Sequence, residues 1–380
     1  MRGSNPLATS GSLRKLLVAV LALVVLGALA YRSRSLITLQ GFSWDRLWHS
    51  VQQARVSLLL LSLATIYTCY AIRALRWVRF SRYLGKPTFV NVFTSTLIGF
   101  ATIFLLGRAG EPIRPLLIAR KDRLPVSGTF GIYVLERVFD SGSTAVILGL
   151  SLLLFPGTLS SGGTNVVWEA RARAAGLVLL AGLLAAVIFL VYFRLHGAVA
   201  LERRLAGWRA STRWRRRAAG IFAGFSEGLQ AIQTVPDLVA ATFYSTVHWA
   251  LIAMVYLWVA HSFGGGLAAI DFPGAMLVLA FTMVGSAFQL PAVGGGSQAA
   301  SFLAFTVIFG VEKEPAAAAA IMLWLITFSA VTLVGAPLLI REGWSMGELR
   351  RLARAEAEAE AAGTHLAEPD VSTKPGELLR

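Results

Sequence analysis

Gly107-Arg108-Ala109-Gly110-Glu111-Pro112-Ile113-Arg114-Pro115 is the stretch that organises the chain, together with Leu135-Glu136-Arg137-Val138-Phe139-Asp140. The two stretches place six charged side chains in apolar sequence: residues 88–106 carry no charge, and residues 126–155 hold Glu136, Arg137 and Asp140 near their middle. A charge at the centre of a membrane helix costs roughly 2.5–3.5 kcal/mol on insertion scales. Such charges need a partner or a function.

The composition is that of an integral membrane protein. Of the 380 residues, 56% are hydrophobic and 14% are charged, whereas soluble domains carry about 25% charged residues. Apolar windows long enough to cross a bilayer recur, which predicts an all-α polytopic membrane fold. The net charge is +15, and the basic residues lie in short loops between these windows. We therefore expect anionic or phosphate-bearing membrane lipids as partners, and no nucleic acid.

Metal, cofactor and disulfide chemistry have no visible basis in the sequence. Cys69 is the single cysteine, and it lies in an apolar run. The five histidines show no spacing typical of metal ligands. We expect no cofactor, no metal and no catalytic constellation.

We divide the chain into a disordered tail (residues 1–12), a transmembrane domain (13–345) and a polar, partly helical tail (346–380). About six full crossings are predicted, with both termini cytoplasmic. They are residues 16–30, 56–72, 126–155, 174–193, 236–261 and 316–340. The first also fits a signal peptide.

Three features outside the spans carry further expectations. Residues 203–233 fit an amphipathic surface helix, and a solvated basic loop is the alternative. Trp44 and Trp48 fit interfacial aromatics. The arginines after residue 72 fit a cytoplasmic loop.

Two re-entrant hairpins, inserted from opposite faces, complete the predicted topology. Residues 88–106 are followed by a turn and by an apolar piece too short to cross, and a basic loop at residues 120–123 returns to the cytoplasm. Residues 272–290 and 299–310 flank a glycine turn in the same way. Broken helices that meet near the midplane are typical of secondary transporters.

The charged stretches could bind a phosphate group. Pro112 suits the first position of a helix, and helix amino ends with flanking arginines, here Arg108 and Arg114, bind phosphate. Glu136 and Asp140 share a helix face and could pair with either arginine. Arg137 lies about 100° around that helix. The alternative is a buried ionic lock that touches no substrate; proton coupling through the carboxylates is a weaker option.

Further candidate substrate-binding residues lie elsewhere. Their amides or side chains could face an anion or a headgroup, although close packing or snorkelling at the interface explains them equally well. They are Glu111, Gly294, Gly295, Gly296, Gln298, Arg73 and Arg76.

The motifs Gly107–Arg114, Leu135–Asp140 and Leu290–Gly296 together resemble the transmembrane region of lysylphosphatidylglycerol synthases, a flippase-like family. Arg73-Ala74-Leu75-Arg76-Trp77 is similar to another stretch of that pattern. The resemblance covers about residues 13–340. Many members carry Glu near the glycine turn, where this chain has Gln298.

The resemblance implies lipid translocation in members fused to an aminoacyl-transferase domain, and polyprenyl- or hopanoid-type lipids or envelope glycolipids in stand-alone relatives, so the cargo is open. We expect a multi-pass protein of the bacterial cell (inner) membrane that moves an amphipathic, phosphate-bearing lipid between leaflets through a polar cavity between the hairpins. The alternatives are a membrane enzyme or accessory subunit acting on a lipid-linked substrate of envelope lipid or glycolipid synthesis, and a non-transporting scaffold. Homo-oligomers and a lipid-synthesis enzyme partner are left open. The short polar tail argues against an aminoacyl-transferase domain.

Overall fold

The computed structural model describes residues 42–154, 170, 173–185, 232, 234–286, 288–290 and 292–343, without the side chains of Arg108, Ala109 and Gln289. The predicted first crossing, the surface helix and both terminal tails lie outside this description. So does the end of the predicted crossing at residues 174–193, of which the helix Arg173–Ala185 is described.

Long apolar helices dominate the described residues and confirm an all-α polytopic membrane protein. Five are long and apolar enough to cross a membrane. They are α4 (Val56–Ser81), α5 (Phe89–Leu106), α7 (Val126–Leu154), α11 (Val235–Ser262) and the continuous helix Lys313–Arg341. The last consists of α14 (Lys313–Trp324), the π-helical turn η4 (Leu325–Ser329) and α15 (Ala330–Arg341).

The chain reverses direction where the first hairpin is predicted; that this hairpin re-enters a membrane stays a prediction. Helix α5 has the length of a crossing, but the 3-10 turn η1 (Gly107–Gly110) reverses the chain into the short helix α6 (Ile113–Asp122). Gly107 has φ 68°, and Gly110 lies against the backbone of Thr102, where a side chain would collide. Pro112 caps α6 as expected for a helix start.

The chain also reverses direction where the second hairpin is predicted, and a pair of short strands is added there. Helix α12 (Phe272–Ser286) leads to the strands β1 (Gln289–Leu290) and β2 (Gly294–Gly295), which pair antiparallel. Helix α13 (Gly296–Leu303) and the π-helical turn η3 (Ala304–Ile308) return. Gly285 and Gly296 pack so closely that a side chain on either would strike the other's carbonyl. The sequence did not predict the strand pair.

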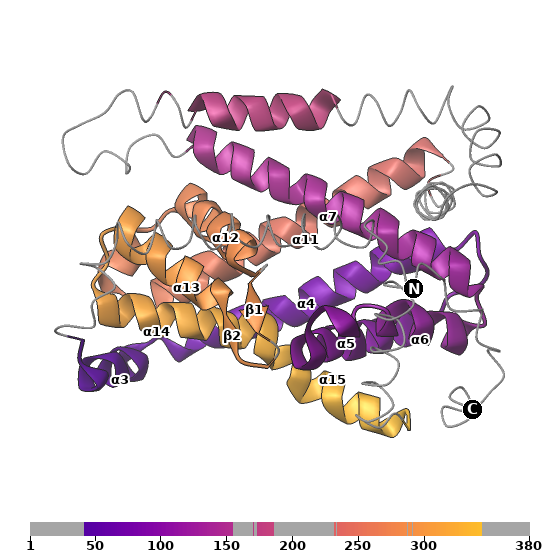
Figure 1. The fold of residues 1–380 in the computed structure, drawn as a ribbon, viewed down its shortest axis with the longest axis horizontal. Helices are drawn as coiled ribbons and strands as arrows, with labels where there is room; N and C mark the ends of the chain where they lie inside the picture. Colours follow the sequence, from indigo (N-terminus) through magenta and orange to yellow (C-terminus); the bar gives the residue numbers. More distant parts are fainter. Residues whose placement is uncertain are drawn as a thin grey trace, which may run out of the picture.

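The two hairpins start from opposite ends of the helix bundle. Hairpin 1 (α5, η1, α6) and α15 lie to the right in Figure 1, and hairpin 2 (α12, β1, β2, α13, η3) lies to the left, with the strands between them. At the open end of hairpin 1, Lys121 pairs with Glu342 at 2.6 Å. Near the other end, the Arg55 N–H donates to the Ser262 carbonyl at 2.8 Å. Opposed hairpins are therefore a property of the fold; their depth in a membrane stays a prediction.

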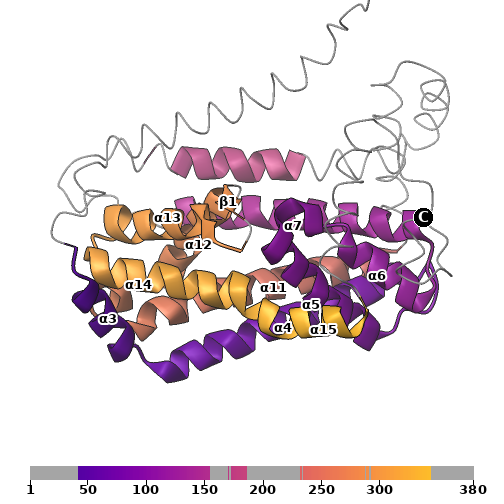
Figure 2. The same cartoon turned by 60° about the horizontal axis from the view of Figure 1, so that its bottom comes forward.

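A short helix closes the end of the bundle opposite α6. Helix α3 (Trp44–Gln53) lies beside α14 at the left of Figure 2. Buried Glu314 accepts a hydrogen bond from the Ser43 N–H at 3.1 Å and pairs with Arg46 at 3.1 Å. Trp44 and Trp48 are exposed, as interfacial aromatics would be. The 3-10 turn η2 (Gly265–Ala269) connects α11 to α12 at the same end.

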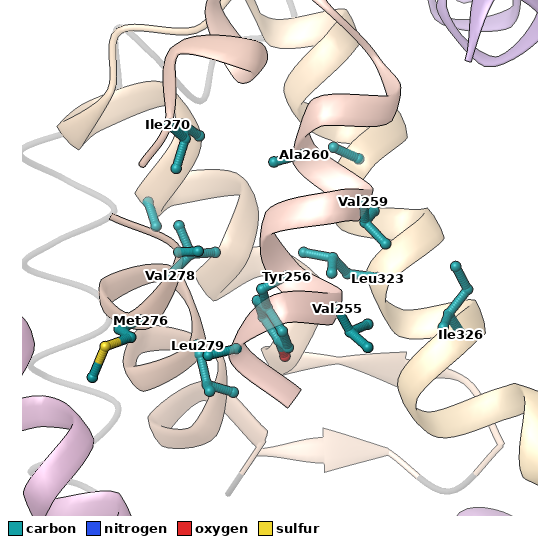
Figure 3. Close-up of a cluster of buried hydrophobic side chains, with 14 of the residues drawn as sticks. Val255, Tyr256, Val259, Ala260, Ile270, Met276, Val278, Leu279, Leu323 and Ile326 are labelled. Atoms are coloured by element: carbon teal, nitrogen blue, oxygen red, sulfur yellow. The ribbon is translucent and has the colours of Figure 1, made fainter. Parts of the chain in front are cut away.

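The main apolar core holds the second hairpin against α11 and α14. Figure 3 shows Tyr256 of α11 on the side of Leu279 of α12, and Val255 and Val259 of α11 on the side of Leu323 of α14. These side chains are almost fully buried, and in a membrane protein such a core holds its helices together by close van der Waals packing. The charged residues lie outside this core.

One predicted boundary is wrong and matters for the site. The sequence suggested that the second crossing ends at residue 72 and that a cytoplasmic loop follows. Helix α4 instead continues to Ser81, and Arg73 and Arg76 lie buried within it. The helix can continue because both guanidiniums find carboxylate partners inside the bundle, as described below.

Candidate functional site

The site starts from two arginines on one turn of α4. Arg73 and Arg76 are three residues apart, so both side chains leave the same face of the helix. They are 6% and 1% exposed. Buried guanidiniums require carboxylate or other acceptors, because an unpaired buried charge is strongly destabilising.

Helix α7 supplies the acceptors. Arg73 Nη1 donates to Glu136 Oε1 at 2.9 Å and to Asp140 Oδ2 at 2.8 Å. Arg76 Nη2 donates to Glu136 Oε1 and to Asp140 Oδ1, both at 3.0 Å. Two arginines spaced by three residues thus meet two carboxylates spaced by four, and the four side chains tie α4 to α7.

Hairpin 1 contributes the third arginine. Arg114 of α6 donates to both carboxylate oxygens of Glu136, with Nη1 at 3.4 Å from Oε1 and Nη2 closer to Oε2. Its guanidinium carbon lies 4.9 Å from the centre of the Trp77 ring, 5.4 Å from Phe100 and 5.7 Å from Tyr133. Cation–π attraction in such a desolvated place contributes about 2 kcal/mol or more. Arg114 therefore anchors the hairpin by charge and by ring contacts.

Helix α11 completes the network with two neutral side chains. Ser245 Oγ accepts from Arg76 Nη1 at 2.7 Å and donates to the Ala241 carbonyl at 2.7 Å. His248 Nε2 lies 3.0 Å from Arg73 Nη2, and its Nδ1 lies 3.3 Å from the Cys69 carbonyl. Because a guanidinium only donates, Nε2 is the acceptor and the proton sits on Nδ1.

We call Arg73, Arg76, Arg114, Glu136 and Asp140 the arginine cluster. Its members are between 0% and 9% exposed. Three guanidiniums face two carboxylates, which leaves one net positive charge buried. The Nε atoms of Arg73 and Arg76 are also buried without a hydrogen-bond partner among the described residues. An excess of positive charge with unused donors is the electrostatic pattern of an anion site.

A partly exposed arginine of α7 lies beside the cluster. Arg137 is 41% exposed, lies 3.9 Å from Glu136 Oε2 and covers the Tyr133 ring at 5.0 Å. The Tyr133 hydroxyl donates to Glu111 of the hairpin turn. Arg137 therefore lies next to the buried cluster, and its charge is only loosely paired with that of Glu136.

The structure joins most of the predicted charged residues and corrects some expected pairs. Arg114 pairs with Glu136, as one alternative stated, whereas Asp140 bonds to Arg73 and Arg76 instead of Arg114. Snorkelling of Arg73 and Arg76 to the interface is wrong, because both are buried. The side chain of Arg108 lies outside the described residues, so its predicted role stays a prediction.

The glycine turn forms a separate region of the molecule. Gln298 Oε1 accepts from the Gly295 N–H, and Gln298 Nε2 donates to the Val293 carbonyl at 3.4 Å. The Gly295 amide is therefore already used inside the turn, which leaves this predicted donor unavailable to an anion in this conformation. Gly294 and Gly296 serve close packing, because a side chain at either would collide with its neighbours.

Several residues of the site were not predicted. Tyr133, Ser245 and His248 contact the arginine cluster without standing in a charged motif, and Trp77, which belongs to the stretch Arg73–Trp77 quoted above, contacts it as well. Trp77 follows Arg76 directly, and His248 lies in the middle of an apolar span, so their positions offered a weak signal. Among the described residues no group of three or more His, Cys, Asp or Glu side chains is placed to hold a metal ion.

Comparison with known proteins gives one match. A family model described as "Lysylphosphatidylglycerol synthase TM region" matches residues 14–335, which is most of the chain. The match includes both hairpins and every member of the arginine cluster. A search of curated proteins finds no match.

Proposed function

Since the chain belongs to the lysylphosphatidylglycerol synthase TM region family, we propose that it is a lipid transporter that moves phosphate-bearing lipids between the leaflets of a membrane. Membership supports an integral membrane protein in a lipid-related process. The buried charge excess of the arginine cluster carries the more specific proposal, because it selects for an anionic headgroup.

The charge balance of the arginine cluster supports an anionic headgroup such as phosphate. With arginine protonated and both carboxylates ionised, the cluster holds one more positive than negative charge in a site removed from water. A phosphate oxygen next to the unused Nε donors of Arg73 and Arg76 compensates that charge. The same guanidiniums remain bonded to Glu136 and Asp140, so the helices stay in place when the headgroup leaves.

Arg137 offers the first contact for an arriving headgroup. It is the one described arginine of this region that is both half-exposed and next to the cluster, and its bond to Glu136 is long at 3.9 Å. A headgroup attracted by Arg137 passes toward Arg73 and Arg76, while its acyl chains stay in the lipid. The chain is proposed to move this lipid and not to modify it.

The proposal is tested with purified protein in vesicles. Fluorescent phosphatidylglycerol, phosphatidylcholine and a phosphate-free glycosyl diacylglycerol are each supplied, and a membrane-impermeant quencher reports the fraction that changes leaflet. We expect phosphate-bearing lipids to exchange much faster than the glycolipid. Exchange of none of the three points to the alternative class, an accessory subunit or enzyme of lipid synthesis, and equal exchange of all three rejects recognition of the phosphate.

Arg137→Gln separates substrate contact from architecture. The substitution removes a half-exposed charge whose loss leaves the pairs of the cluster intact, so melting temperature should stay at the wild-type value. Exchange of phosphatidylglycerol should fall about tenfold, the effect of roughly 1.4 kcal/mol. Arg82→Gln at the exposed end of α4 is the control and should change neither quantity.

We further propose a bacterial inner membrane and a cytoplasmic basic end. The basic residues Arg82, Lys86 and Arg123 are exposed at the open end of hairpin 1, whereas Asp271 and Glu312 are exposed at the other end, a bias typical of a cytoplasmic basic side. An impermeant thiol reagent added to intact cells should label Ala268→Cys and spare Arg123→Cys. The reverse labelling pattern rejects this orientation.

A further inference from the structure

The tips of the two hairpins touch at the centre of the molecule. The Ala292 N–H donates to the Phe104 carbonyl at 2.7 Å, which joins the turn of hairpin 2 to the last helical turn of α5. The Phe104 ring packs on Trp324 of α14 at 5.7 Å between centres. Figure 1 shows β1 and β2, the tip of hairpin 2, in this central position between α13 and α5.

Backbone strain opposes this contact. Ala292 has φ 59°, and among the described non-glycine residues only Arg123 shares a positive φ. Arg123 is the left-handed cap of α6, a common place for that conformation. Ala292 lies in a turn and gains no such cap, so its left-handed backbone is unfavourable for an alanine. The cost of a left-handed alanine, about 1–2 kcal/mol, is similar in size to the net gain from one hydrogen bond, about 0.5–1.5 kcal/mol.

The side chains around the Ala292–Phe104 contact add little to hold it together. Ala292 and Val293 are exposed. Trp324 Nε1 is buried with no acceptor among the described residues, although it lies next to Gly294. A buried donor without a partner marks a place where the packing is incomplete in this state.

The helix next to the contact changes its winding there. The π-helical turn η4 starts directly after Trp324, between α14, which packs on hairpin 2, and α15, which packs on hairpin 1. The Tyr67 hydroxyl donates to the Ala330 carbonyl at 2.9 Å and fixes the far end of that turn. Such π-helical turns interrupt the regular ladder and occur at functional sites. The π-helical turn therefore lies between the helix segment that packs on hairpin 2 and the segment that packs on hairpin 1.

We propose that Ala292, Phe104 and Trp324 form a tip latch, which parts to let a lipid headgroup cross between the hairpins and closes again behind it. This inference rests on the proposed lipid transport. It goes beyond that proposal by naming the segment that moves and the residues that hold it closed. Hairpin 2 is the part that moves, because residues 272–308 carry no charge that motion would expose. The arginine cluster stays fixed on α4, α6 and α7.

Two substitutions at one position move the latch in opposite directions. Ala292→Gly removes the left-handed penalty and keeps the N–H, so the closed population should rise about fivefold relative to the open one. Ala292→Pro removes the N–H and cannot adopt φ 59°, so the open population should rise. The glycine variant folds without strain, so the test stands even where the proline variant does not fold.

Distances between spin labels report the two states without any transport assay. Labels at Val90→Cys of α5 and Val284→Cys of α12, which are 62% and 64% exposed, are placed in a Cys69→Ala background in lipid nanodiscs. Wild type should show two distance populations, with the shorter enriched in Ala292→Gly. A single population, identical in wild type and variant, overturns the latch.

A reversible cross-link tests whether parting is needed for transport. Phe104→Cys with Ala292→Cys locks the tips under oxidation, and exchange of fluorescent phosphatidylglycerol should stop and return on reduction. Arg55→Cys with Ser262→Cys is the matched control, since these residues share a backbone bond of 2.8 Å at an end of the bundle. Unchanged exchange in the locked 104–292 protein overturns the latch. Two distance populations in a wild type that exchanges no lipid would support the moving tip and reject lipid transport.

Discussion

Both hairpins consist of two helices joined by a turn, but their chemistry is opposite. Hairpin 1 is fixed by Arg114, whose buried charge is shared with α4 and α7 through Glu136. Hairpin 2 has no charged residue between residues 272 and 308 and is held by close contacts of Gly285 and Gly296 and by the apolar core. The difference separates two tasks in one symmetric arrangement. One hairpin holds the electrostatic site in place, and the other can shift without uncovering a charge.

Removing the carboxylate of Glu136, which the three arginines share, should lower the stability of the protein more than any other change considered below. Glu136→Gln leaves three guanidiniums facing Asp140 alone, and an uncompensated buried charge costs about 3–5 kcal/mol. We expect a large fall in the melting temperature in detergent. Arg114→Met combined with Glu136→Gln should recover part of it. Glu312→Gln, at an exposed carboxylate, is the control; a Glu136→Gln protein as stable as this control would contradict the assigned network.

Adding one methyl group at Gly296 of hairpin 2 should lower the stability of the protein by an intermediate amount. A Cβ at Gly296 would overlap the Gly285 carbonyl, and overpacking costs about 1–3 kcal/mol. Gly296→Ala should therefore melt earlier than wild type. Gly182→Ala is the matched change, because a Cβ there has open space and alanine favours the helix. Equal melting temperatures of the two variants would show that the glycine contact does not hold hairpin 2.

Adding a charge to hairpin 2 should have the smallest effect on its fold. In Gln298→Glu the carboxylate still accepts from the Gly295 N–H and gains from the nearby amino end of α13, but it loses the weak bond to the Val293 carbonyl. These changes oppose each other, so stability should move by less than about 1 kcal/mol. A large loss of stability would mean that the neutral amide is required to close the turn.

The sequence anticipated the elements well because apolar length and turn residues act locally. Helix α7 begins at Val126 as predicted, and Pro112 and the glycines mark both hairpin turns. The end of α4 was missed for the opposite reason. A local reading ends a membrane helix at its first arginine, and the partners that keep Arg73 inside come from α7, 63 and 67 residues later.

For the site, the sequence indicated the charged residues but not their neutral partners. Glu136 and Asp140 pointed to a partner, and the equally regular spacing of Arg73 and Arg76 was available as its match. Nothing in the sequence could show that His248 and Ser245 would reach the same guanidiniums, because single polar residues in apolar helices usually serve their own backbone. The contact between Ala292 and Phe104 is a hydrogen bond between two backbones, so the types of the two side chains do not predict it.

The long separation between α4 and its carboxylates also sets a condition on biosynthesis. Arg76 leaves the ribosome 60 residues before Glu136, a delay of about 3–12 s at ordinary translation rates. During that time each unpaired arginine opposes entry into lipid by roughly 2.5–3.5 kcal/mol. Helix α4 should therefore wait beside the insertion machinery until α7 is made, and the two helices should enter the membrane as a neutralising pair.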